Sequence, residues 1–481
     1  MSIKHGVTII EQPTSVLAPT QADSGIPFVV GTAPVHLASA PVPVNTPVLV
    51  FNYAEAVAAM GYSDNWDDYT LSEMIYSHFA LYAKAPMILV NVLDPANHKT
   101  TVAPAALPVS NRVATLAVDG VLLPSVVVKS ADGATTYSKV TDYTAAFDDN
   151  GHVMITTKST GVIGASVAQL QVGYDKLNPT AVDADDIIGG VTMDGTYTGF
   201  ELVNQAYPRF GILPDLLLAP GWSHYPAVAA VMKAKAGNIN GNFKAIALTD
   251  IDPAQPFTDA GAWKSEKSYT GTLQIATYPM LTLGDKRFHF STQLAGLIAT
   301  TDAVNGGIPF VSPSNKGLQA DGTALADGKA QYLGMDQATY LNGLGIMTAV
   351  NLGTSGWRSW GNYTGAFPGV TDPKDSFIPI RRMFNWVGNS LILTYMQKVD
   401  DPMNKRLIAA VTDSVNIWLN GLTASGALLG GRVEFLESEN TQSDLMSGKI
   451  TFHVYITPPG PAQEINFLIE YDASYLSALF A

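Results

Sequence analysis

The chain of 481 residues contains no cysteine, which excludes disulfide bonds, thiolate nucleophiles and zinc–thiolate sites and fits assembly in a reducing cytoplasm. Charged residues make up only 14% of the chain, against about a quarter in a typical soluble domain. So little charge indicates a subunit that is largely covered by its neighbours. The net charge of −14, from 27 basic and 41 acidic residues, argues against binding to a phosphate backbone. No apolar run is long enough to span a membrane, and residues 1–5 open no signal peptide.

Motifs of catalysis and cofactor binding are also missing from the sequence. The eight histidines lie far apart, without the close pairing that a zinc site needs. The stretch 322–330 resembles a phosphate-binding loop only superficially, because its glycines are separated by five residues instead of four. There is neither a Gly-x-Ser-x-Gly elbow nor a dinucleotide fingerprint after a strand. We therefore expect no cofactor, no metal and no catalytic residue.

Three small clusters allow both a functional and a structural interpretation, and the structural one is favoured for each. Asp183, Asp185 and Asp186 could form a calcium loop, but a solvated loop is favoured. Arg381 and Arg382 could bind an anion, but ion pairs within the fold or with a neighbour are favoured. Trp357 and Trp360 around Arg358 could stack on a ligand, but aromatic packing is favoured.

Apolar runs alternate with helical patterns through two separate parts of the chain, which predicts a layered α/β domain over 21–100 and 197–355. The strands are expected at 26–33, 47–50, 87–92, 213–219, 243–248, 273–278 and 344–350. Thr70 and Glu73 have the spacing of a capping box, so a helix is expected from there to about residue 84.

Between these two parts, residues 101–196 are rich in threonine, valine and alanine and have no long helical period. Asp-Gly and Asn-Gly dipeptides at 119–120, 132–133 and 150–151 are strong hairpin-turn signals. This stretch is predicted to be an all-β module inserted into the α/β domain.

A C-terminal α+β module is expected over 356–462. A helical pattern covers about 376–398, and a second amphipathic helix is expected to start with Asp401 as N-cap and Pro402 at the first helical position. The last strand of the module alternates in character and places four apolar side chains on one face: Ile450, Phe452, Val454 and Ile456.

Both ends of the chain are predicted to be extended arms, 1–20 and 463–481, that each carry one short strand. The spacer 458–461, Pro-Pro-Gly-Pro, is too stiff for a tight hairpin, so the second strand is held away from its own module. A strand with unpaired main-chain groups pairs with a sheet edge elsewhere, which indicates a polymer. The arm residues expected to lie between subunits are His5, Gly6, Val7 and Ile9 at one end and Ile465, Phe467, Ile469 and Tyr471 at the other.

An ordered set of short motifs resembles the tail sheath proteins of contractile-tailed bacteriophages. Each motif is weak, but together they cover roughly half of the chain in the family's order. They are HGV at 5–7, PVLV at 47–50, SPSN at 312–315, WGNYT at 360–364, IWLNGL at 417–422 followed by GAL at 426–428, and GKI at 448–450. Tyr363 departs from the family pattern, in which arginine often follows Trp-Gly-Asn.

The resemblance implies a structural subunit, not an enzyme, that polymerises as stacked hexameric rings around a tail tube and contracts to drive the tube through the host envelope. It implies that the arms of neighbouring subunits complete a sheet beside the accepting strand at 449–457 and that the C-terminal module faces the tube. Lys405 and Arg406 are candidate tube contacts, with ordinary solvated helix charges as the alternative. The implied partners are other copies of the chain, the tube, the baseplate and the tail terminator, without direct nucleic acid or membrane contact. The implied location is a virion tail assembled in the bacterial cytoplasm.

Two alternatives stay open on the sequence alone. The particle is either a phage tail or a phage-tail-like bacteriocin. An oligomeric α/β enzyme of the hydrolase type, assembled by strand exchange, is the alternative of a different class.

Overall fold

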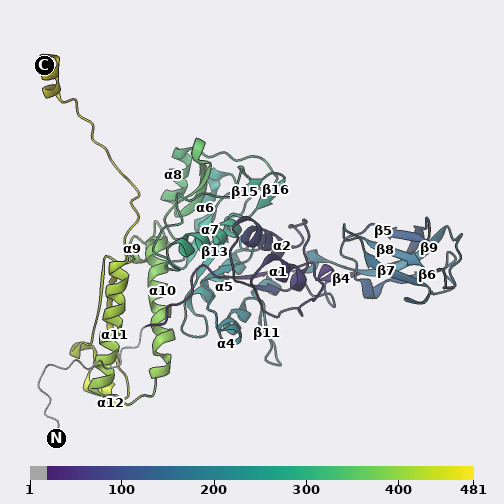
Figure 1. Cartoon of the computed structure of the whole chain (residues 1–481), viewed down its shortest axis with the longest axis horizontal. Coiled ribbons are helices and arrows are strands. Elements are labelled where there is room, and N and C mark those ends of the chain that lie inside the picture. The colour runs from purple at the N-terminus through teal and green to yellow at the C-terminus, as the bar shows by residue number, and fades with distance from the viewer. Residues whose placement is uncertain (1–18, 481) are drawn as a thin grey trace, which may run out of the picture.

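The computed structural model describes residues 19–480, and an eight-stranded mixed sheet forms the centre of the body (Figure 1). Its strand order is β19-β18-β14-β13-β12-β1-β3-β2, with six parallel strands inside and an antiparallel strand at each edge. The strands are β1 (Pro27–Gly31), β2 (Val48–Val50), β3 (Met87–Asn91), β12 (Leu216–Leu218), β13 (Ile246–Asp250), β14 (Gln274–Thr277), β18 (Ile346–Asn351) and β19 (Trp357–Trp360). All seven strands predicted for the body are therefore present. β19, which was not predicted, joins the same sheet.

Side chains alternate between two buried faces of this sheet, which explains why its strands are continuous apolar runs. Val29, Leu89 and Leu248 point into one core. That core also contains side chains of α1 (Tyr53–Met60), α2 (Thr70–Ile75) and α7 (Phe290–Val304). Phe28, Val90 and Leu217 point into the other core, against α3 (Ala184–Ile188), α4 (Ala206–Phe210) and α5 (Pro226–Gly237).

The remaining body elements form small sheets and a satellite core. β15 (Met280–Leu283) pairs with β16 (Lys286–Phe288) and β17 (Gly322–Ala324), and β10 (Gly190–Val191) pairs with β11 (Tyr197–Thr198). α6 (Phe257–Glu266) and α8 (Met335–Gly343) pack beside β14 and β18.

Six strands between 99 and 177 form two three-stranded antiparallel sheets around a separate core. They are β4 (Lys99–Pro108), β5 (Val113–Leu116), β6 (Val127–Lys129), β7 (Tyr143–Phe147), β8 (Val153–Thr157) and β9 (Gln169–Leu177). Gly120, Gly133 and Gly151 all have φ between 74° and 79°, as the turn dipeptides predicted. Figure 1 shows these strands projecting from the body at the end opposite α10 and α11.

The C-terminal part is built on two long helices, α10 (Ile378–Tyr395) and α11 (Lys405–Ala424), preceded by the short α9 (Pro373–Ser376). β20 (Gly430–Glu434), α12 (Gln442–Met446) and β21 (His453–Thr457) follow α11. The apolar stripe of α11 packs against α10 and the two strands. The last element is a 3-10 helix, η9 (Ala473–Phe480).

Three local predictions are wrong, each because a stronger partner exists. Thr70 does not cap α2: its hydroxyl accepts a hydrogen bond from Thr32 N, and Glu73 accepts from His289 instead of closing a capping box. After Ile75 the helix continues in π form over Tyr76–Leu81.

The second wrong prediction is the N-cap of α11, which is Asn404 rather than Asp401. The Asn404 side chain accepts from Leu407 N at 3.0 Å, while Asp401 pairs with Lys398. The third is the aspartate loop near 183. Asp183 caps the start of the short helix α3 and forms a capping box with Asp186, so these aspartates belong to a helix N-terminus and not to a loop, although Asp183 and Asp185 are exposed to solvent as predicted.

Candidate assembly interface

The C-terminal sheet consists of only two strands, β20 and β21, paired antiparallel with Val433 opposite Val454 and Gly431 opposite Ile456. One face of the sheet packs on the core shared with α10 and α11, where Phe452, Val454 and Ile456 are partly buried. Within residues 19–480, β21 pairs with β20 alone, so the main-chain groups on its other edge have no strand beside them. Such an edge is a template for a further strand.

The predicted accepting strand begins later than expected, because Asn440 binds the main chain just before it. The Asn440 side chain donates to Thr451 O at 2.9 Å and accepts from Thr451 N at 2.7 Å. These bonds occupy both polar groups of Thr451, so the ladder starts at His453. Ile450 and Phe452 therefore lie before β21, and only Val454 and Ile456 of the four predicted residues are in the strand.

An apolar groove of about 680 Å³ opens where α10 ends and α11 begins. We call it the α10–α11 groove. The charged side chains that line it, Lys398, Asp400 and Asp401, are exposed. Its other lining residues are mostly apolar: Leu391, Ile392, Tyr395, Val399, Met403, Leu407, Val411, Val415, Val433, Gly448, Ile450, Phe452 and Val454. Thus Ile450 and Phe452, which lie outside the strand, contribute their side chains to the lining of the groove.

The C-terminal arm leaves the body without packing on it. Residues 461–472 form neither helix nor strand, and Figure 1 shows them running away from the body to η9. The four predicted arm residues are highly exposed: Ile465 (70%), Phe467 (84%), Ile469 (95%) and Tyr471 (78%). This much apolar surface in solvent is unfavourable for a single chain, and their pairing with a neighbour stays a prediction.

One contact fixes where this arm departs. The Tyr363 hydroxyl hydrogen-bonds Gln463 Oε1 at 3.0 Å. The Tyr363 ring stacks on Phe367 with centroids 3.8 Å apart and on Phe377 at 5.1 Å. The buried Lys264 ammonium donates to the carbonyls of Gly365 and Phe367, and burial lowers its pKa to about 8. The arm is thus anchored beside the N-terminal end of α10.

The N-terminal arm residues His5, Gly6, Val7 and Ile9 lie outside the described residues. The described chain begins beside the opposite end of α10. Thr20 N donates to Thr394 Oγ1 and Ala22 N to Ser390 Oγ, both at 2.9 Å, and Trp386 Nε1 donates to Ala22 O at 2.8 Å. These three helix residues are one turn apart, so residues 20–22 follow α10 toward its N-terminus.

Lys405 and Arg406 are the first two residues of α11 and are exposed. No ion pair to either is found among the described residues. Cations in the first turn oppose the helix dipole, and no acidic side chain offsets them there. Helix stability therefore does not explain these residues. Contact with the tube stays a prediction for them, with ordinary solvated helix charges as the alternative.

A buried ion cluster fixes α10 to the body. Arg382 Nη2 lies 2.5 Å from Asp302 and 2.7 Å from Asp215, and Asp215 also accepts from Ile26 N at 2.8 Å. Burial raises the pKa of Asp302, and the Arg382 charge opposes that shift. Arg381 pairs with Asp375 at 2.8 Å. Both arginines therefore pair within the fold, as the structural interpretation predicted.

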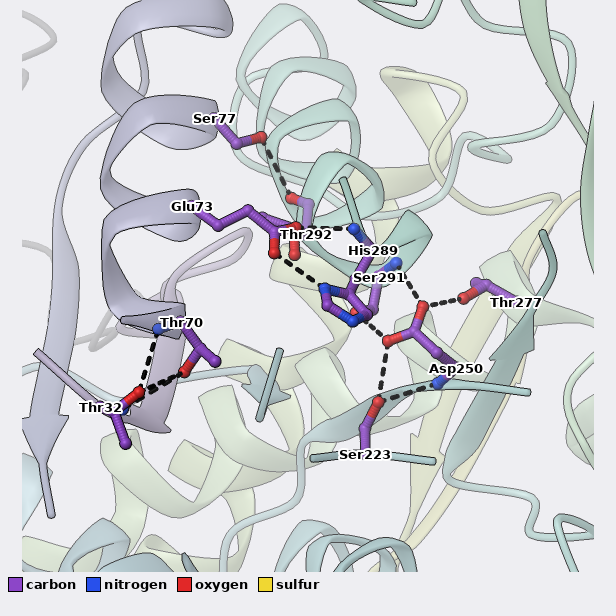
Figure 2. A network of polar contacts seen from close by, with 10 residues as sticks. All are labelled: Thr32, Thr70, Glu73, Ser77, Ser223, Asp250, Thr277, His289, Ser291 and Thr292. Atoms are coloured by element: carbon purple, nitrogen blue, oxygen red, sulfur yellow. Dashed lines mark hydrogen bonds and ion pairs between the residues drawn. The ribbon is translucent and has the colours of Figure 1, made fainter. Parts of the chain in front are cut away.

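At the carboxyl ends of β13 and β14, where an α/β enzyme would bind its ligand, side chains hydrogen-bond one another (Figure 2). Asp250 accepts hydrogen bonds from Ser223 Oγ, Thr277 Oγ1 and both the main-chain N and the hydroxyl of Ser291. His289 Nδ1 lies 2.8 Å from Glu73. The hydroxyls of Ser223 and Ser291 bind the Asp250 carboxylate, and neither binds an imidazole. This cluster therefore lacks the serine–histidine pair that activates a serine nucleophile.

The order of the parallel strands reverses between β1 and β12, and this switch point is also closed. A Cβ at Gly31 would lie 2.4 Å from Thr70 Oγ1, and one at Gly221 would lie 3.0 Å from Thr70 Cγ2. Thr32 and Thr70 hydrogen-bond each other across it (Figure 2).

The other candidate residues from the sequence make packing contacts and hydrogen bonds within the fold. Trp357 is buried and stacks near Tyr332, with centroids 6.4 Å apart, and Arg358 donates to Asn315 O. Residues 322–324 form β17 rather than a loop before a helix. Over residues 19–480, no three histidine or acidic side chains gather as a metal site, and no helix is long and apolar enough to cross a membrane.

Taken together, these elements form a mixed α/β multidomain fold that resembles that of contractile sheath subunits. The chain superimposes on the sheath of an extracellular contractile injection system (PVC, contracted state) with a TM-score of 0.60 and 14% identity, covering 99% of both chains. It superimposes on the contracted helical sheath of the anti-feeding prophage with a TM-score of 0.58 and 15% identity, covering 98% of this chain and 100% of that one.

Sequence comparison gives more particular relatives. The chain is 29% identical to the tail sheath protein of Burkholderia phage BcepMu over 99% of its own length and 98% of the relative's. It is 28% identical to a putative prophage major tail sheath protein of Pseudomonas aeruginosa over 65% of its length and 79% of the relative's. No family model matches the chain. The chain is a homologue of phage tail sheath proteins, which confirms the resemblance seen in its motifs.

Sequence reasoning missed the α10–α11 groove, the Asn440 bonds and the Tyr363–Gln463 anchor. The departure of Tyr363 from the family pattern was the one signal that pointed to the last of these.

Proposed function

We propose that this chain is the subunit of a contractile tail sheath, which polymerises as stacked hexameric rings around a tail tube and contracts to drive the tube through a host envelope. Homology to a phage tail sheath protein along nearly the whole chain supports the class. The single observation that supports polymerisation is that the same chain has both a sheet with an unpaired edge, within residues 19–480, and an exposed, extended arm.

The arms complete the C-terminal sheets of neighbouring subunits. His5, Gly6, Val7 and Ile9 form one arm strand, and Ile465, Phe467, Ile469 and Tyr471 form the other, beside Val454 and Ile456 of β21. Main-chain hydrogen bonds contribute about 0.5–1.5 kcal/mol each, whereas each buried apolar side chain contributes about 1.5–3 kcal/mol. Burial of the arm's apolar side chains therefore dominates the stabilisation of the array.

Lys405 and Arg406, at the exposed start of α11, contact the tube. The other partners are further copies of the chain, the baseplate and the tail terminator. The sheath is part of a virion tail or a related contractile particle and is assembled in the bacterial cytoplasm. It binds no cofactor and makes no direct contact with nucleic acid or membrane. The energy of contraction is stored on assembly, and no nucleotide is hydrolysed.

Negative-stain electron microscopy of the purified full chain tests this proposal. Striated tubes or rods are expected, and compact particles of fixed size would instead support the oligomeric enzyme. A variant that lacks residues 1–12 should remain soluble and folded but fail to form long tubes. Tubes of full length from that variant would contradict the arm model while leaving the sheath class intact.

A further inference from the structure

The α10–α11 groove is an apolar concavity that the described chain leaves open. It lies at the C-terminal turn of α10, where Leu391 and Tyr395 line it, and at the N-terminal half of α11, where Leu407 and Val411 line it. At about 680 Å³ it has the size of a site for several side chains. A concavity lined mainly by apolar side chains can receive the apolar face of a docking helix.

The chain also carries an unpartnered segment that matches this groove in chemistry. The helix η9 contains no charged side chain. Its large side chains are exposed to solvent: Tyr475 (78%), Leu476 (47%), Leu479 (79%) and Phe480 (91%). Moving side chains of this kind into an apolar groove is strongly favourable.

The chain's own η9 does not occupy its own groove, because its large side chains are exposed. The Tyr363–Gln463 contact anchors the arm beside Phe377, at the N-terminal end of α10, whereas the groove lies at the other end of that helix. About 14 helical residues separate the two places, which is roughly 20 Å. From the anchor, the arm runs away from the groove (Figure 1). The arm is long enough to cover this distance, so its direction away from the body, and not its length, points to a second copy as the source of the occupant.

The direction of β21 shows how the arm would reach that groove. Val454, near the start of β21, lines the groove, and Thr457, at its end, does not. An arm strand that pairs antiparallel with β21 runs from the Thr457 end toward the His453 end and delivers η9 to the groove. A parallel arm would deliver η9 to the opposite end of the strand.

We propose that η9 of one copy occupies the α10–α11 groove of a second copy, after residues 464–472 have paired antiparallel with that copy's β21. This inference rests on the proposed function, in which arms dock on neighbouring subunits. It adds an apolar helix-in-groove contact to the strand pairing and fixes the orientation of the arm.

The absence of cysteine makes a direct test possible, because every thiol in a variant is introduced on purpose. Leu476→Cys on η9 and Met403→Cys in the groove, 40% exposed, are combined in one full-length chain and oxidised after tube assembly. A disulfide requires Cβ atoms about 3.5–4.5 Å apart. The expected result is a ladder of covalent multimers on a non-reducing gel, which collapses to monomer on reduction.

The matched control combines Leu476→Cys with Ile417→Cys, an α11 residue that is 59% exposed and does not line the groove. This pair should give no ladder above that of either single variant. A ladder from the control as strong as that from the groove pair would overturn the proposal, because it would report collision rather than docking.

Three further outcomes are distinguishable. An intrachain cross-link, seen as a monomer of altered mobility, would show that η9 occupies its own groove and would overturn the proposal. Tubes without any 476–403 cross-link, but with a ladder from Val7→Cys and Met403→Cys, would assign the groove to the N-terminal arm. Failure of the unmodified chain to form tubes or rods would refute the proposed function itself.

A second variant tests the energetics without introduced thiols. A chain that ends after Asp472 retains the arm strand and lacks η9. It is expected to form tubes only at a protein concentration raised about tenfold or more, since each tenfold corresponds to about 1.4 kcal/mol. An unchanged concentration for assembly would overturn the proposal.

Discussion

The two main sheets of this chain differ most at their edges. In the body sheet, β2 has only three residues and follows Pro47, and the β19 edge is covered by Asn315 and Leu318, whose N–H groups donate to Ser359 O and Trp357 O. In the C-terminal sheet, β21 offers an open edge and is only half-buried on its inner face. Natural sheets protect their edges when they act alone. The contrast therefore separates a body whose sheet edges are protected within the chain from a module whose sheet keeps an unpaired edge within residues 19–480.

The largest effect is expected from a substitution that breaks the junction between α10 and the body. Arg382→Met removes the cation between Asp302 and Asp215 and leaves two buried carboxylates without a counter-charge. Breaking a buried pair in this way costs about 3–5 kcal/mol. Urea unfolding of the full chain, followed by tryptophan fluorescence, should show this loss in the free energy of unfolding.

The matched control is Arg432→Met, which removes an exposed pair with Glu434 in the C-terminal sheet. A loss of about 0–1 kcal/mol is expected there. Equal losses in the two variants would contradict the view that buried charge stabilises the junction of α10 with the body and not the C-terminal sheet.

A second test of the body uses pH. Burial lowers the pKa of His289, but the charge and hydrogen bond of Glu73, with Asp250 and Asp67, together raise it to about 9. Because this folded pKa is above the usual 6.5, the stabilisation is complete below pH 6.5 and is lost as pH rises through 9. The loss should be about 3 kcal/mol between pH 6 and pH 10.

Glu73→Gln should lower stability at pH 6 and remove most of this pH dependence, as measured by urea unfolding at several pH values. Glu439→Gln, beside the more exposed His453, is the control and should leave the pH profile of the wild type. A Glu73→Gln profile with an undiminished slope above pH 7 would refute the role of this pair.

A third prediction concerns the open module. Phe467→Asp changes an arm side chain that is 84% exposed and makes no contact with the body core. The free energy of unfolding of the monomer should stay within about 0.5 kcal/mol of wild type. Assembly should weaken by about 1.5–3 kcal/mol per arm, which shortens or abolishes tubes in electron micrographs.

Asn466→Asp, on the neighbouring arm residue, is the control for added charge, because alternation places it on the opposite face of the arm strand. If both variants assemble as poorly as each other, net charge rather than burial of Phe467 controls the interface.

The smallest effect is expected at the start of α11. Lys405→Glu with Arg406→Glu removes two cations that oppose the helix dipole, so the C-terminal module should become more stable by about 0.3–1 kcal/mol. If these residues contact the tail tube, less of the variant protein should nevertheless sediment together with purified tail tubes. A gain in stability with unchanged tube binding would remove them from the interface.

The body could be predicted from sequence because buried parallel strands are continuous apolar runs, as in residues 87–91 and 246–250. The ion cluster could not, because Arg382 meets residues 80 and 167 positions away. The later start of β21 depends on Asn440, whose side chain reaches Thr451 only after the chain has folded back. The N-cap of α11 was misplaced because Asp401 and Asn404 are both suitable, and local geometry chooses between them.

The residues of the candidate interface also fall into a group that the sequence predicts and a group that it does not. Alternation identified the apolar residues of the arm and two of the four residues in β21, because period two is visible in one dimension. The groove combines side chains from α10, α11 and the segment before β21, so it exists only in three dimensions.

The chain enters the described structure beside Thr394 and its C-terminal arm departs near Phe377, at opposite ends of the 18-residue helix α10. About 25 Å therefore separates the two points of departure. If each tail binds a different neighbour, the joint is head-to-tail, and a filament built from it has two unlike tips. Such a filament would therefore grow and contract with a defined polarity. The length of α10 sets the distance between its two attachment points.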